Sequence, residues 1–446
     1  MTTHLAVPAG VRPDVAPIQR RTLRLLFTTQ IIGGVGVTIG ISVGALLAER
    51  IAGAAVAGLA QSAGVVGGAL LAVPITRVMT GYGRRPGLVL AYLTGALGGV
   101  LVVTAAAARS VPLLFLGMLL FGGGTAANLQ ARYTAVDLAE PARRGRQLSL
   151  IVWATTVGAV AAPNFASLAD DTTSRWGLPR LAGPFAFSAV AFLVAAVVIF
   201  ALLRPDPLLT ARRIAASEVG DGDRQGGPGP RNGAEPALPG ARPRAAGMWS
   251  AWRTVRQRPA ARLGIAAVAM GHLVMVGVMA MTPVHLGESH GDADVLHVVG
   301  VVLSLHIAGM YALAPVVGWL TDRAGRRPVI LGGTALLLAA CAVAGTAGHD
   351  TVLLSVGLVL LGLGWSATMV AGSTLLSESV PVAERPTVQG LSDLTMGLAG
   401  AAAGAASGFV VQVAGYPVLT LLAAVAVVPL VALALRPAAV SAPEEE

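Results

Sequence analysis

Twelve apolar runs, each about 20 residues long, recur along this 446-residue chain and constrain its fold more than any other feature. A helix of about 20 residues crosses the hydrocarbon core of a bilayer, which is about 30 Å thick. Apolar residues make up 55% of the chain and charged residues only 12%, which is too little charge to cover three soluble domains. Because only helices and closed barrels satisfy the backbone in lipid, we predict an all-α membrane protein. The predicted spans are 25–47, 53–77, 87–108, 112–134, 147–169, 183–203, 263–285, 294–319, 329–347, 351–376, 389–412 and 417–435.

The basic residues predict the orientation of these spans. All 31 of them are arginine, and the formal net charge is +9. If both termini lie in the cytoplasm, the outer loops hold only Arg50, Arg109, Arg175 and Arg180, as the positive-inside rule requires. We therefore expect a multi-pass protein of the plasma (inner) membrane with cytoplasmic termini. The charge is then a marker of orientation, and we expect the lipid bilayer and no nucleic acid as a partner.

A long polar segment divides the chain into two halves of six spans. Its middle is rich in glycine, proline and charge, and it has too little apolar surface to fold alone. We predict a largely disordered cytoplasmic linker over 204–262. The predicted organisation is an N-terminal tail at 1–24, a six-helix bundle at 25–203, the linker, a second six-helix bundle at 263–436 and a C-terminal tail at 437–446.

The two halves repeat each other. Gly83-Arg84-Arg85-Pro86 follows the second span, and Gly325-Arg326-Arg327-Pro328 follows the eighth. Internal repeats of this kind are typical of secondary transporters, whose substrate site lies near the midplane where the repeats meet.

The second-half loop, Gly318-Trp-Leu-Thr-Asp322-Arg323-Ala-Gly325-Arg326-Arg327, is a full match to the signature loop of the major facilitator superfamily, and nearly the whole chain resembles that family. The resemblance implies two pseudo-symmetric six-helix bundles (the major facilitator fold) and transport by alternating access. A carboxylate beside guanidiniums at a helix end makes bonds that can break and re-form between two states. The first-half copy has Thr80 in place of the acid and Thr76 in place of the first glycine. The resemblance implies a gating role for Gly318, Asp322, Arg323, Gly325, Arg326 and Arg327.

Ionisable side chains deep in a membrane are functional candidates because burying them there is costly. The deep titratable residues are His272 and His306, whereas Asp137 and Asp393 fall near predicted inner helix ends and no carboxylate is predicted near mid-depth. Helical spacing places His272, Met275 and Met279 on one stripe, and His306 and Met310 form an i, i+4 pair on the next span. These spans are antiparallel, so Met275 and His306 are predicted at nearly the same depth. A thioether–imidazole cage can therefore form at mid-membrane.

Thioether and imidazole groups are ligands that suit Cu(I). The two spacings, MxxxM and HxxxM, resemble the copper-importing branch of the major facilitator superfamily, which supplies copper for cytochrome oxidase assembly. That resemblance implies that Met275, Met279, His306 and Met310 bind the metal. His272 has no counterpart in the two motifs and is a candidate auxiliary ligand or proton carrier at most.

The alternative reading is that these methionines only fill the core. The matching first-half residues, Gly34, Thr38, Gly64 and Gly68, indicate that the fold itself does not demand Met or His there. Other polar side chains are candidates for lining a cavity, namely Gln30, Gln61, Trp153, Asn164 and Trp365.

Three functions follow from these patterns. The first is uptake of copper ions, and the second is proton-coupled efflux of drugs or small organic metabolites. In the fifth span, Gly158-Ala-Val-Ala-Ala162-Pro163 is similar to the motif of proton-linked drug exporters, with Ala162 where glycine is expected, but small residues at this spacing also simply permit close helix packing. The exporters' fourth-span arginine motif is missing, since Met118 and Phe121 stand at its Arg and Gln positions. A membrane receptor or scaffold, the third, needs neither the repeat nor the gating loop. We expect a monomer with a small-molecule or metal-ion substrate, with protons as a candidate coupling ion, no cofactor and no enzymatic activity.

Overall fold

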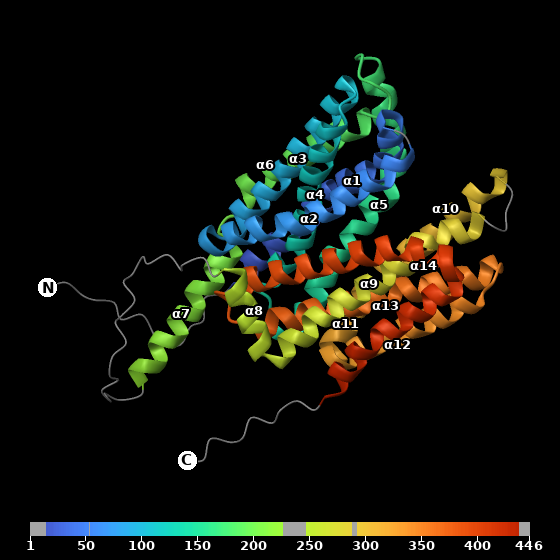
Figure 1. The fold of residues 1–446 in the computed structure, drawn as a ribbon. Helices are drawn as coiled ribbons and strands as arrows, with labels where there is room; N and C mark the ends of the chain where they lie inside the picture. The colour runs from blue at the N-terminus through green and yellow to red at the C-terminus, as the bar shows by residue number, and fades with distance from the viewer. Residues whose placement is uncertain (1–14, 53, 226–246, 288–291, 437–446) are drawn as a thin grey trace.

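The computed structural model describes residues 15–52, 54–225, 247–287 and 292–436, and their regular structure is entirely helical (Figure 1). The first half contains α1 (Ala16–Ala52), α2 (Ala54–Tyr82), α3 (Arg84–Ala108), α4 (Val111–Thr134), the short 3₁₀ helix η1 (Pro141–Arg143), α5 (Arg144–Ser174) and α6 (Gly183–Leu202). Between the halves lie α7 (Pro207–Gln225) and α8 (Met248–Gln257). The second half contains α9 (Pro259–Gly287), α10 (Asp292–Tyr311), α11 (Ala314–Ala324), α12 (Arg326–Thr346), α13 (Thr351–Ser379) and α14 (Arg385–Leu435).

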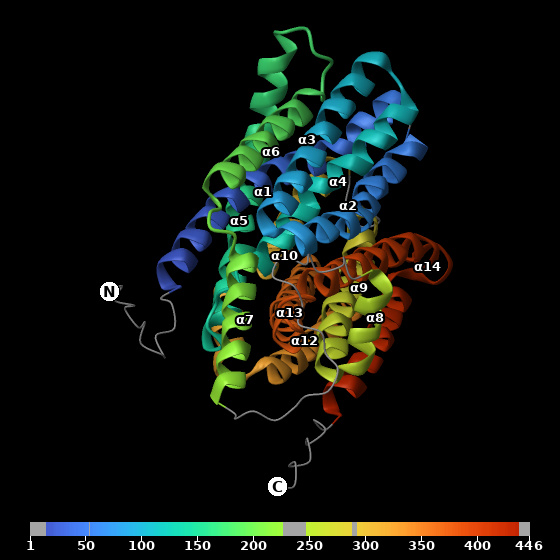
Figure 2. The same ribbon diagram turned by 90° about the vertical axis from the view of Figure 1, so that its left-hand side faces the viewer.

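The helices form two bundles, α1–α6 and α9–α14, each with its own large apolar core (Figures 1 and 2). The two bundles meet at the end of the molecule that carries α7 and α8, which we call the linker end. The fold class predicted from the sequence is confirmed.

The observed helices do not correspond one to one with the twelve predicted spans. By length and hydropathy, nine helices in the described ranges are long and apolar enough to cross a membrane. One of them, α14, is broken at Gly415 (φ 81°, ψ 171°), so it supplies two of the predicted spans. The predicted eighth span is also divided, because α10 ends at Tyr311 and α11 starts just before Pro315. Proline restricts the residue before it and so favours such a break.

The segment predicted as a disordered linker contains two helices. Asp206 begins α7, because its Oδ1 accepts hydrogen bonds from the amides of Leu208 and Leu209 at 3.0 and 3.2 Å. The short helix α8 buries Ala251 and Val255 in a small core cluster with α9, α13 and α14. The glycine-rich middle of the segment, 226–246, lies outside the described residues.

Glycines allow α2 and α4 to pack backbone against backbone. A Cβ built at Gly67 would overlap the Leu119 carbonyl, and one built at Gly122 would overlap the backbone at Gly68. Small residues at such crossings are typical of membrane bundles, where close approach replaces the hydrophobic effect as the driving force. This packing positions α4, which carries the buried arginine described next.

Candidate functional site

A cavity of about 370 Å³ lies between the two bundles and takes its walls from both. Helices α1, α2, α4 and α5 line one side, and α9, α10, α13 and α14 line the other. Most of the lining is apolar, as is usual for sites that bind small organic molecules. The polar side chains in the lining are Gln30, Thr38, Thr125, Asn128, Arg132, Thr155, His272, Tyr311, Trp365 and Asp393.

Two of these groups form an ion pair between the bundles. Arg132 of α4 donates from Nη2 to Oδ1 of Asp393 of α14 at 2.6 Å, and the two side chains are only 3% and 2% exposed. The other carboxylate oxygen accepts from Nε2 of Gln130 at 2.7 Å. Removing one partner of a buried pair costs about 3–5 kcal/mol, because the remaining charge is left uncompensated. The pair therefore bridges the two bundles on the linker side of the cavity, and neither charge can be removed alone without that cost.

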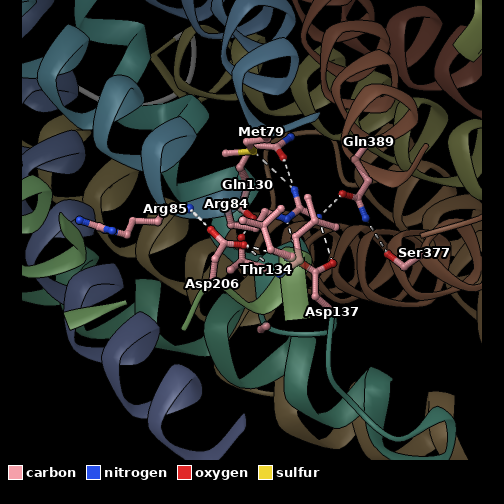
Figure 3. Close-up of polar contacts among 12 residues, drawn as sticks. Met79, Arg84, Arg85, Gln130, Thr134, Asp137, Asp206, Ser377 and Gln389 are labelled. Carbon is pink, nitrogen blue, oxygen red and sulfur yellow. Dashed lines mark hydrogen bonds and ion pairs between the residues drawn. The ribbon is translucent and has the colours of Figure 1, made fainter. Parts of the chain in front are cut away.

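A second buried arginine extends this network toward the linker end (Figure 3). Arg84, the first residue of α3, binds both carboxylate oxygens of Asp137, at 2.7 and 3.2 Å. It also donates to Oε1 of Gln130 at 3.2 Å and to Oε1 of Gln389, in α14, at 2.6 Å. Gln130 thus contacts Arg84 through its carbonyl and Asp393 through its amide, so the two ion pairs form one continuous polar layer between the bundles.

The second-half signature loop contacts the opposite bundle directly. Asp322, near the end of α11, accepts hydrogen bonds from the backbone amides of Gly145 and Arg146, both at 2.8 Å. These amides belong to the first turn of α5, where free N–H groups and the helix dipole favour a negative charge. A Cβ built at Gly318 would overlap Oγ of Ser149, so glycine is what allows α11 to approach α5. Asp322 and Gly318 therefore both belong to the contact between α11 and α5 at the linker end.

Arg326 of the same loop binds a carboxylate that the sequence did not single out. Its Nε and Nη2 donate to the two oxygens of Glu378 on α13, at 3.0 and 2.7 Å. Nη2 also donates to the carbonyl of Pro141 in the first half at 2.7 Å. Arg144 of α5 lies 3.7 Å from the same carboxylate. Glu378 is therefore the centre of a second contact between the halves.

The remaining loop residues contact their own half. Gly325 joins α11 to α12 with φ 94°, a conformation that favours glycine. The guanidinium of Arg323 lies 5.5 Å from the ring centre of Trp319, and Arg327 donates to the carbonyl of Arg436 at 2.5 Å.

The first-half copy makes the symmetry-related contact with different chemistry. Thr80, in the position of the acid, hydrogen-bonds through Oγ1 to Oγ1 of Thr387 at 3.0 Å. The first turn of α14 contains Pro386, which has no N–H and so cannot donate to a carboxylate as α5 does. The positions of the glycine and the side chain are also exchanged. In the second-half loop Gly318 faces Ser149 of α5, whereas in the first-half copy Thr76 faces Gly390 of α14. The departure from the signature is therefore matched on the opposite helix.

The sequence profile of the Major Facilitator Superfamily matches residues 25–296 and 293–446. The chain belongs to this superfamily. It is accordingly a multi-pass membrane protein and a secondary transporter of the facilitator type.

Relatives agree with this assignment over nearly the whole chain. The facilitator is 38% identical over 407 residues to the uncharacterized MFS-type transporter YdeG of Bacillus subtilis, covering 91% of this chain and 89% of that protein. It is 26% identical over 423 residues to the riboflavin transporter RfnT of Brucella anthropi, covering 95% of this chain and 96% of that protein. Among solved structures, the E. coli fucose:proton symporter FucP aligns with a TM-score of 0.64 at 18% identity, covering 95% of this chain and 98% of that one.

The predicted histidine and methionine ligands of this facilitator are divided between two environments. Met275 and Met310 line the cavity, as does His272, whose Nδ1 accepts a hydrogen bond from Trp365 Nε1 at 3.2 Å. Because an indole N–H only donates, that nitrogen carries no proton. His306 is fully buried, and its Nδ1 lies 2.8 Å from the carbonyl of Leu358 in α13.

Met279 packs against the apolar core of the second bundle. Neither Met279 nor His306 is among the described residues that line the cavity. Of the predicted cavity residues, Gln30 and Trp365 line it. Trp153 stacks on Phe27 instead, with ring centres 5.8 Å apart. The side chains of Gln61 and Asn164 lie outside the described part of the structure.

Sequence reasoning missed the role of Arg132 and Asp393. Each lies near a predicted inner helix end, where a charge usually only marks topology. What distinguishes these two residues from other arginines and carboxylates is that they pair with each other although 261 residues separate them in the chain. Only the packing of α4 against α14 shows this pairing.

Proposed function

We propose that this facilitator carries a small, flat, hydrogen-bonding organic solute by alternating access, with the cavity between the bundles as its binding site. The observation that carries the proposal is that both bundles line the cavity, while polar contacts between the bundles close it at the linker end. Because one chain supplies both walls, we propose that a monomer is the functional unit.

The cavity lining favours an aromatic heterocycle as substrate. Phe121, Tyr311 and Trp365 offer ring surfaces, and Tyr311 packs edge-on to Trp365 with centres 5.6 Å apart. Gln30 and Asn128 add amides that can both donate and accept. Aromatic walls with a few fixed polar groups suit a planar ring system with polar edges. The likeness to a riboflavin transporter supports a flavin-like heterocycle as the substrate class.

Copper uptake is the second candidate, because the thioethers of Met275 and Met310 both line the cavity. A cage of all four predicted ligands would require His306 and Met279 to turn toward the cavity from their present positions. His306 would then give up its contact with the Leu358 carbonyl.

For the orientation, we propose that the linker end lies in the cytoplasm and that the membrane is the plasma membrane, because the arginines are concentrated at that end. Proton-coupled efflux would use the same cavity in the opposite direction. Transport in right-side-out and inside-out vesicles, with and without a proton gradient, separates uptake from efflux.

The test is transport of riboflavin and of Cu(I) by the full chain in proteoliposomes. We expect riboflavin transport that is lost in Trp365→Leu and kept in Met275→Leu/Met310→Leu, since leucine conserves the volume of methionine and spares the fold. Copper accumulation that is lost in the methionine variant, together with no riboflavin transport by the wild type, would overturn the proposal in favour of copper.

A further inference from the structure

A second hollow, of about 730 Å³, lies on the surface where α1 meets α6 near the linker end. Its charged part consists of Arg20, Arg21 and Arg24, all in the first turns of α1. Its apolar part contains Leu25 from α1 and Val198 and Leu202 from α6. We call this hollow the α1–α6 groove.

The three arginines of the groove have no carboxylate partner within the described ranges, because none of the ion pairs found there includes them. All three are exposed, and the spacings 20/24 and 21/24 place them on one face of α1. Like charges at these spacings repel each other. An anion bound in the groove would relieve that repulsion.

The apolar part of the groove continues into the lipid-facing surface. The lipid-facing surface of α6 is marked by its exposed valines. These are Val190, Val194 and Val197, whose side chains are 61%, 43% and 57% exposed. The α1 helix rises about 1.5 Å per residue, so its apolar groove residue, Leu25, lies within one helical turn of the arginines. Charge at the membrane edge and apolar surface just below it match the two parts of a phospholipid.

We propose that the α1–α6 groove binds an anionic phospholipid of the leaflet at the linker end. The guanidiniums of Arg20, Arg21 and Arg24 hold its phosphate, and an acyl chain lies against Leu25, Val198 and Leu202. Arginine binds phosphate oxygens in a bidentate manner, and basic pockets between helices at the cytoplasmic side of membrane proteins are suited to anionic headgroups. A free phosphate would use the arginines but would leave the apolar part of the groove empty. The proposal goes beyond the transport cycle and does not depend on which solute is carried.

The test uses the purified full chain in a neutral detergent. Binding of phosphatidylglycerol is measured by native mass spectrometry and by the shift in the thermal unfolding midpoint. Phosphatidylcholine with the same acyl chains and soluble glycerol phosphate serve as comparisons. We expect phosphatidylglycerol alone to bind tightly. Each arginine near an anionic surface contributes about fivefold in affinity, so Arg20→Gln/Arg21→Gln/Arg24→Gln is expected to weaken binding by about 100-fold.

The matched control is Arg77→Gln/Arg143→Gln/Arg213→Gln, which removes the same charge from exposed positions outside the groove. It is expected to keep its affinity for phosphatidylglycerol. Equal weakening in both triple variants, or equal binding of glycerol phosphate, would overturn the proposal. If the groove variant fails to fold, Arg24→Gln alone is expected to weaken binding by about fivefold, and unchanged affinity in that variant would overturn the proposal.

Discussion

Replacing Asp393 by asparagine tests whether the ion pair with Arg132 holds the linker end closed. The substitution keeps the shape of the side chain but leaves Arg132, which is 3% exposed, without its counter-charge. The cost is about 3–5 kcal/mol in the conformation that buries the pair. When the linker end opens, water solvates Arg132, so the cost largely disappears. The equilibrium should therefore shift toward the open conformation by about two to three and a half powers of ten.

The assay is a distance measurement between spin labels on exposed residues of the two halves. Cysteines introduced at Ala142 and Ala324, in a Cys341→Ala background that removes the native thiol, report the separation at the linker end. We expect a longer mean distance in Asp393→Asn than in the parent protein. Asp171→Asn, which changes an exposed carboxylate outside the cavity lining, is the matched control and should leave the distance unchanged.

A double variant completes the test. In Arg132→Gln/Asp393→Asn both charges are removed, so the uncompensated charge disappears and closure should be partly restored. An unchanged distance in Asp393→Asn, or equal opening in the single and the double variant, would refute a role for the ion pair in closure.

Three further predictions concern the linker end. Asp322→Asn removes the charge at the start of α5 and is expected to favour opening by about 1–2 kcal/mol, measured with the same spin labels; no change would contradict the capping role. Gly318→Ala is expected to abolish transport because its Cβ would overlap α5, whereas Gly332→Ala, with nothing within 4 Å of the added atom, should transport normally. Arg212 of α7 donates to one backbone carbonyl in each half, at 2.8 and 2.9 Å. Arg212→Ala is therefore expected to favour opening by about 1 kcal/mol. Unchanged distances between the spin labels would show that α7 has no part in closure.

The contrast between the two signature loops shows why some of the site could not be read from one sequence. The replacement of an acid by Thr80 is visible in the sequence, but its meaning depends on Pro386, 306 residues later in the chain. Only the packing of α2 against α14 shows that a carboxylate there would lack the amide donor that Gly145 supplies to Asp322. His306 is a second example. Its helical spacing is compatible with a metal cage, and only the structure shows that its ring contacts α13 instead.

The sequence by itself determined the membrane class, the all-helical fold and the second-half signature loop, and it predicted twelve spans in two halves. These properties depend on local composition and spacing, because lipid requires every span to be an apolar helix whatever its neighbours are. The tertiary structure decided which polar groups meet. It brought together segments that are distant in the chain, namely Arg132 with Asp393, Asp322 with the start of α5, and the arginines of the α1–α6 groove with α6. Helix periodicity fixes the face of each residue within its own helix, but only the packing of the helices determines what that face contacts.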